Sequence, residues 1–205
     1  MSEDVGAKTA ATSTVFLDRD GVVNRALVRD GKPFAPRALR DFRMLPGTAA
    51  AVASLRLAGF MIVVVTNQPD IGNGLVDQAT VDAMNDRLRR RVEVDDVLVC
   101  PHRQDEGCGC RKPAPGLLLT AAARHSIDLA ASYMVGDRWS DVAAGNAAGC
   151  FTIFIDRGYR EARPEMPDAV VGSLRAAASL ILARKRIGTG RNAAATPSKP
   201  SFFWL

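Results

Sequence analysis

The sequence predicts an α/β fold, a Rossmann-like three-layer sandwich with a central parallel sheet, because short apolar runs alternate with longer helical stretches. A continuous apolar run of about four to eight residues is typical of a buried parallel strand. Polar residues follow several of these runs directly. Open α/β sheets bind their ligands at the carboxyl ends of the strands, so this pattern predicts a site along one edge of the sheet.

Five strands and five helices are expected from the apolar pattern and the helix boundary signals. The strands are 15–18, 61–66, 96–100, 133–136 and 151–155. The helices are 48–58, 78–92, 117–124, 141–148 and 174–185, and the first of them begins after Pro46-Gly47 and ends at Gly59. We expect one domain over 14–186, preceded by a flexible leader, 1–13, and followed by a basic and disordered tail, 187–205.

Composition indicates an ordinary globular chain, with 47% hydrophobic and 24% charged residues. No apolar stretch approaches the roughly 20 residues needed to cross a bilayer, and the leader contains no signal-peptide core. We therefore expect a cytoplasmic protein without a membrane partner, and a monomer.

The net charge of +5 comes from the end of the chain. Residues 184–205 contain five bases and no acids, which leaves 22 bases and 22 acids in the rest of the sequence. A nucleic-acid-binding domain usually has a basic face, so the neutral body argues against a nucleic-acid partner.

Asp18 and Asp20 directly follow the first apolar run, and Gly21 allows the chain to turn sharply after them. One carboxylate can attack a phosphorus atom while its neighbour transfers a proton. The alternative is a turn in which the aspartates only cap the following backbone.

Three further groups of polar residues follow predicted strands or precede a predicted helix. Thr66, Asn67 and Gln68 offer hydrogen-bond donors for phosphate oxygens, and in isolation they would be read as a polar turn. The other two groups are Arg111-Lys112, which offers a fixed cation, and Asp137-Arg138 with Asp141. Asp18 and Asp137 suit one hard cation such as Mg²⁺, and Asp141 would support the site from behind or cap the helix.

Three of the four cysteines lie near a histidine, in the order Cys100, His102, Cys108 and Cys110. Three thiolates and one imidazole form a closed tetrahedral Zn²⁺ set, which leaves no open position for catalysis. A disulfide is less expected in a chain without an export signal. We predict a structural zinc ion in this loop.

Together these motifs resemble the haloacid dehalogenase-like (HAD-like) phosphohydrolases, and the resemblance covers about residues 15–159. It implies that Asp18 is a nucleophile that forms an aspartyl-phosphate and that Asp20 is the general acid and base. It further implies that Thr66 and Lys112 hold the phosphoryl group. Mg²⁺ would be bound by Asp18, Asp137 and the backbone carbonyl of Asp20.

The zinc loop resembles the subfamily of heptose-bisphosphate and histidinol-phosphate phosphatases. This implies removal of the 7-phosphate of D-glycero-D-manno-heptose 1,7-bisphosphate, with histidinol phosphate as the alternative substrate. A nucleic-acid 3′-phosphatase and an inactive phosphate-binding protein are the remaining alternatives. Substrate contacts are expected from Arg19, Asn67, Gln68, Arg111 and Arg138.

Two features of the resemblance bear on the substrate. The intervals before and after Thr66 are too short for a separate cap domain, so we expect an open site for a small phosphorylated sugar. Pro69, Asp70 and Asn73 replace the serine, glycine and arginine that the heptose enzymes usually carry, and this leaves the anomer open.

Overall fold

The computed structural model describes residues 12–192, and its centre is a six-stranded sheet in which every neighbouring pair of strands is parallel. The strand order is β5-β4-β1-β6-β7-β8. The strands are β1 (Thr14–Leu17), β4 (Met61–Asn67), β5 (Asp96–Cys100), β6 (Tyr133–Gly136), β7 (Phe151–Ile155) and β8 (Ala169–Val171). The α/β fold class with a parallel sheet is thereby confirmed.

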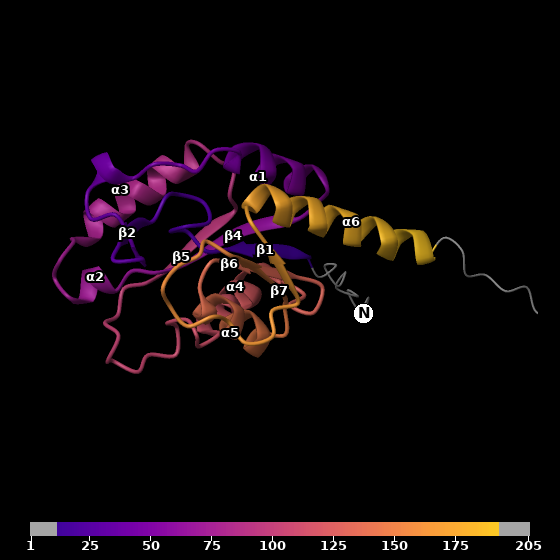
Figure 1. The fold of residues 1–205 in the computed structure, drawn as a ribbon. Helices are drawn as coiled ribbons and strands as arrows, with labels where there is room; N and C mark the ends of the chain where they lie inside the picture. The colour runs from indigo at the N-terminus through magenta and orange to yellow at the C-terminus, as the bar shows by residue number, and fades with distance from the viewer. Residues whose placement is uncertain (1–11, 193–205) are drawn as a thin grey trace, which may run out of the picture.

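Helices cover both faces of the sheet, as Figure 1 shows. One face carries α1 (Thr48–Leu57), α3 (Gln78–Arg89) and α6 (Leu174–Asn192), and the other carries α4 (Gly116–His125) and α5 (Trp139–Ala148). The core is accordingly divided between the two faces. Val15 and Leu17 of β1 point into one apolar cluster, and Phe16 points into the other, as the alternation of side chains along a strand requires.

Several elements differ from the expectations. The sequence did not indicate β8, the short helices η1 (Leu39–Asp41) and α2 (Pro69–Gly72), or a hairpin formed by β2 (Leu27–Arg29) and β3 (Lys32–Phe34). The helix expected to end at Lys185 continues to Asn192, and α5 begins at Trp139 rather than at Asp141. Strands of three residues carry too little periodicity to stand out in a sequence.

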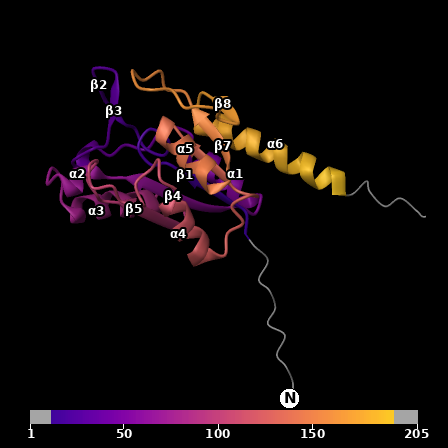
Figure 2. The ribbon, with the colours of Figure 1, turned by 90° about the horizontal axis from the view of Figure 1, so that it is seen from below.

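The β2–β3 hairpin projects from the edge of the sheet where the strands end, beside the loop that follows β7 (Figure 2). The backbone NH of Arg160 in that loop donates to the carbonyl oxygen of Gly31 at 2.8 Å. The hairpin is therefore held against the body of the protein on the side where polar residues leave the sheet.

The described residues cover only part of the two terminal segments that were expected to flank the domain. The leader except for Thr12 and Ser13, and all of the tail after Asn192, lie outside the described residues, so the proposed domain boundaries stay a prediction. Within residues 12–192, none of the helices combines the length and apolar character needed to cross a bilayer.

Candidate active site

The register of the sheet brings the predicted catalytic residues together. Leu17 of β1 pairs with Val64 of β4 on one side and with Val135 of β6 on the other. Asp18, Thr66 and Asp137, which follow these positions within two residues, therefore lie side by side at the carboxyl edge of the sheet. All three side chains are buried.

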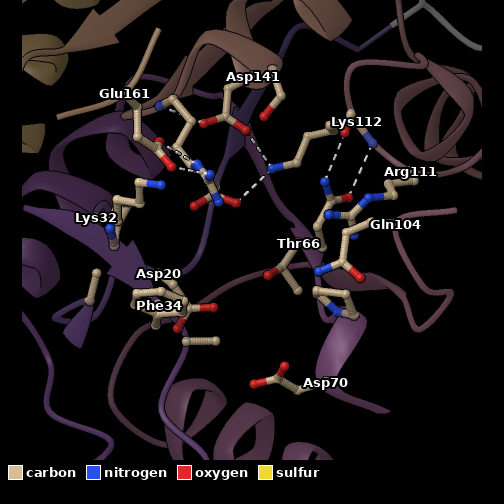
Figure 3. Close-up of a pocket in the computed structure, with 18 of the residues that line it drawn as sticks. Asp20, Lys32, Phe34, Thr66, Asp70, Gln104, Arg111, Lys112, Asp141 and Glu161 are labelled. Carbon is tan, nitrogen blue, oxygen red and sulfur yellow. Dashed lines mark hydrogen bonds and ion pairs between the residues drawn. The ribbon is translucent and has the colours of Figure 1, made fainter. Parts of the chain in front are cut away.

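Lys112 is the centre of the charge network at this edge. Its Nζ atom lies 2.6 Å from Asp18 Oδ1, 2.7 Å from Asp141 Oδ1 and 2.7 Å from the carbonyl oxygen of Val65. Burial alone would lower the pKa of Lys112, but the two carboxylates raise it above its usual value. The lysine is therefore a permanent cation that touches the expected nucleophile Asp18, and Figure 3 shows its ion pair with Asp141.

The positive charge around Asp18 and Asp137 is too small to keep both carboxyl groups ionised at their usual pKa values. Burial raises the pKa of Asp18 to about 7, although Lys112 acts in the opposite direction. Burial, followed by the charges of Asp18 and Asp141, raises the pKa of Asp137 well above its usual value. Three buried carboxylates thus share one ammonium group, and this arrangement favours an additional cation.

The geometry of Asp137 fits a metal ion. Both of its carboxylate oxygens are buried and without a hydrogen bond of ordinary geometry, although the Tyr159 hydroxyl lies nearby. Carboxylate oxygens of Asp18, Asp137 and Asp141 lie within 4.8 Å of one another. A hard divalent cation bound by carboxylates, such as Mg²⁺, fits this donor set.

Gly21 is required by the closeness of Asp137. It has a φ of +99°, and a Cβ atom built there would lie 1.7 Å from Asp137 Oδ2. Only glycine combines this backbone conformation with such a close approach.

Asp20 is held by donors from three residues. Its Oδ2 atom accepts from Gln68 Nε2 at 2.7 Å and from Arg19 Nη2 at 3.0 Å, and its Oδ1 atom accepts from Asn24 Nδ2 at 2.8 Å. Both oxygens are therefore directed by the protein. The side chain is 12% exposed and lines the cavity in front of Asp18.

Arg19 and Gln68 do not occupy the substrate-binding positions expected of them. Arg19 is fully buried, and Gln68 is 1% exposed. Neither residue lines the cavity, and both instead donate to Asp20. Successive side chains in an extended segment point to opposite sides, and this alternation was a signal that Arg19 would not share the cavity face with Asp18.

Asn67, Arg111 and Arg138 do line the cavity. Asn67 donates to the carbonyl oxygen of Lys112 at 2.9 Å and accepts from its backbone NH at 3.1 Å, so it positions the lysine. Arg111 Nη1 is buried without a hydrogen-bond partner, whereas Arg138 is paired with Glu161 at 2.5 and 2.9 Å.

The cavity has a volume of about 410 Å³ and is bounded by residues that the sequence did not single out. The hairpin contributes Lys32 and Phe34, and the far wall contributes Gln104 (Figure 3). Arg37 and Asp70 form an ion pair across it, with Nε 2.6 Å from Oδ2. These residues lie in loops or in elements of three or four residues, whose sequences carry no signal of a common site.

The four predicted zinc ligands also come together. The Sγ atoms of Cys100, Cys108 and Cys110 lie 3.3 to 3.6 Å apart, and His102 Nδ1 lies 3.2 Å from Cys110 Sγ. These sulfur distances exclude a disulfide, whose S–S bond is about 2.05 Å, and they approach the edges of a tetrahedral S₃N set.

The protonation of this cluster also fits zinc. Burial raises the pKa of the Cys100 thiol to about 12. Without a cation the thiol therefore stays protonated, and a bound metal would displace the proton. Cys150, the remaining cysteine, is buried and is not a member of this group of ligand atoms.

Comparisons with known proteins agree with this geometry. A family model described as HAD-hydrolase-like matches residues 109–177. A D-glycero-beta-D-manno-heptose-1,7-bisphosphate 7-phosphatase from Bordetella bronchiseptica is 38% identical over 149 residues, which cover 70% of this chain and 80% of the relative. The corresponding alpha-named enzyme from Mycobacterium tuberculosis is 41% identical over 152 residues, which cover 69% of this chain and 78% of the relative.

The chain belongs to the HAD-like phosphatase family that contains these enzymes. A crystal structure of the D,D-heptose 1,7-bisphosphate phosphatase from B. bronchiseptica, complexed with magnesium and phosphate, gives a TM-score of 0.73 at 34% identity. That comparison covers 84% of this chain and 99% of the other. This HAD-like phosphatase therefore shares both the fold and most of its length with an enzyme that binds magnesium and phosphate.

Proposed function

We propose that this HAD-like phosphatase removes the 7-phosphate of D-glycero-D-manno-heptose 1,7-bisphosphate. The observation that carries the chemistry is the contact between Asp18 and Lys112 beside the unpartnered Asp137 carboxylate. The names of the relatives at 35 to 41% identity support the heptose substrate over histidinol phosphate.

Asp18 is the proposed nucleophile because Lys112 fixes one of its oxygens and the other remains for attack. An oxygen of Asp18 forms a bond to phosphorus while the bond to the sugar oxygen breaks, and Asp20 gives that oxygen a proton. Water then attacks the phosphorus of the aspartyl-phosphate, Asp20 accepts a proton from it, and the bond to Asp18 breaks.

The other residues of the site hold charge in place during these steps. Thr66 and Lys112 bind the phosphoryl oxygens, and Asp141 keeps Lys112 in position from behind. Asp18, Asp137 and the backbone carbonyl of Asp20 would hold Mg²⁺, which neutralises charge on the phosphoryl oxygens. Zinc in the Cys100–Cys110 loop would be structural.

The cavity also offers cations for the second phosphate of the substrate. Arg111 has a buried nitrogen without a partner, and Lys32 faces the same cavity from the hairpin. Guanidinium groups bind phosphate in a planar two-point geometry, so Arg111 is the proposed contact for the distal phosphate. Arg138 would contact sugar hydroxyls from its place beside Glu161.

Phosphate release with Mg²⁺ tests the substrate. The panel contains both anomers of the heptose bisphosphate, because relatives of both names match this chain, together with histidinol phosphate and a short 3′-phosphorylated oligonucleotide. We expect a kcat/KM preference of about 100-fold for one heptose anomer, or about 2.7 kcal/mol of transition-state binding. A preference for histidinol phosphate or the oligonucleotide would reject the heptose proposal.

Asp18→Asn tests the nucleophile. An amide is a poor nucleophile, so phosphate release should fall to background. The midpoint of unfolding should change only as much as a conservative substitution usually changes it. Turnover near that of the unchanged protein would reject the assignment.

A further inference from the structure

Arg19 is a charged side chain buried where the reaction has no direct use for it. It is 0% exposed, yet it lies outside the substrate cavity. A buried guanidinium is unfavourable unless its donors are paired, so the neighbours of Arg19 show what it is for.

Those neighbours come from three parts of the chain. On one side, Nε and Nη2 donate to both oxygens of Asp20 at 3.0 to 3.3 Å. On the other, Nη1 donates to Asn85 Oδ1 at 2.9 Å. The guanidinium carbon also lies 5.7 Å from the centre of the Phe42 ring.

Asn85 is unusual in its own element. The buried residues of α3 are Val81, Met84, Asn85 and Leu88, so Asn85 is the polar member of an otherwise apolar face. It is 3% exposed. An apolar residue would fill this position at less cost in burial, but it would leave the Arg19 Nη1 donor without a partner.

We propose that Arg19, anchored by Asn85, is a positioning residue that fixes the Asp20 carboxylate for both of its proton transfers. The bidentate contact with Arg19 sets the orientation of the Asp20 carboxylate plane. The hydrogen bond to Asn85 holds the guanidinium in place, so the guanidinium and the carboxylate cannot rotate together. The proposal rests on the proposed role of Asp20, and it does not depend on which sugar phosphate is the substrate.

The first proton transfer matters most for a poor leaving group. A sugar alkoxide needs the proton of Asp20 as its bond to phosphorus breaks, whereas p-nitrophenolate leaves without it. The second transfer, from water to Asp20 during hydrolysis of the aspartyl-phosphate, is needed for both substrates. Misplacing Asp20 should therefore affect the two substrates differently.

Asn85→Ala and Arg19→Met test this, because the first variant removes the anchor without touching Asp20. We expect kcat on the sugar phosphate to fall about 10- to 100-fold, the range expected for a misplaced catalytic group, with KM within about twofold. With p-nitrophenyl phosphate the first release of nitrophenolate should stay fast, and a slower steady state should follow it.

Thr152→Val is the matched control. Thr152 is also fully buried, and its hydroxyl lies 3.0 Å from Asp168 Oδ2 and 3.1 Å from Asn146 Oδ1, at the opposite end of the sheet. This variant should lower the unfolding midpoint as Asn85→Ala does and leave kcat unchanged. An equal fall in kcat for the control would show that lost stability explains the effect.

The decisive comparison is made in an Asp20→Asn background. If Arg19 and Asn85 act through Asp20, Asn85→Ala should lower kcat by less than about twofold further in that background. A full 10-fold further loss, or no loss in the single variant, would overturn the proposal. If the unchanged protein released no phosphate from any substrate, the proposed function would fail instead.

Discussion

Lys112→Met should destabilise the protein strongly in the absence of metal. Lys112 is 2% exposed, and it contacts Asp18 and Asp141, which are 7% and 1% exposed. Methionine has a similar length but no charge, so it leaves two buried carboxylates without their cation. Breaking a buried ion pair by removing one partner costs about 3–5 kcal/mol of unfolding free energy.

The loss should depend on pH in a defined direction. The pKa of Asp18 is already raised to about 7, and removing Lys112 raises it further. The folded variant therefore binds more protons than the unfolded chain, whose aspartate pKa is about 3.9, so its stability falls as the pH rises. The difference from the unchanged protein should be largest near pH 8 and should shrink toward pH 5.

Urea unfolding in EDTA, followed by circular dichroism, measures this difference. Arg89→Met is the control, because it breaks an exposed pair with Asp86 at 3.3 Å, which should cost at most about 0.5 kcal/mol. A loss below about 1 kcal/mol for Lys112→Met at pH 8 would refute the reasoning, as would a loss that grows toward pH 5.

Two further variants test the close contacts of the site. Gly21→Ala should abolish activity and weaken the response to Mg²⁺, because its Cβ atom would overlap Asp137 Oδ2. The control Gly149→Ala has a similar φ of +81° but open space around it, so it should cost only about 1 kcal/mol of unfolding free energy and keep activity. Activity titrated against Mg²⁺ compares the two variants, and full activity of Gly21→Ala would contradict the prediction. Cys110→Ser should lower the zinc content measured by elemental analysis below about half an equivalent, and it should reduce thermal stability. The control Cys150→Ser should keep the zinc. Equal zinc content in the two variants would exclude the proposed ligand set.

The parts of the fold with strong local patterns were predictable. The apolar strands and the polar residues after them indicated which side chains meet at the sheet edge, because parallel strands all end there. The β2–β3 hairpin was not predictable, since its position depends on contacts with distant residues such as Arg160. The structure brings together the residues expected at the centre of the site, whereas several residues at its periphery had not been singled out.

Arg19 shows why the periphery is harder. Its charge and its place between two aspartates suggested substrate binding, but its partner Asn85 is 66 residues away, and only the folded structure joins the two. Arg37 and Asp70, 33 residues apart, pair for the same reason. The expected monomeric state and cytoplasmic location stay predictions.

The loop that carries Cys110 also carries Lys112, with a single residue between them. The two proposed metal ions would then exchange on different timescales, because one faces an open cavity and the other is enclosed by four protein ligands. Chelation should first remove activity in a way that added magnesium restores. A slower loss should follow as the loop opens and Lys112 moves away from Asp18, and magnesium alone should not reverse it.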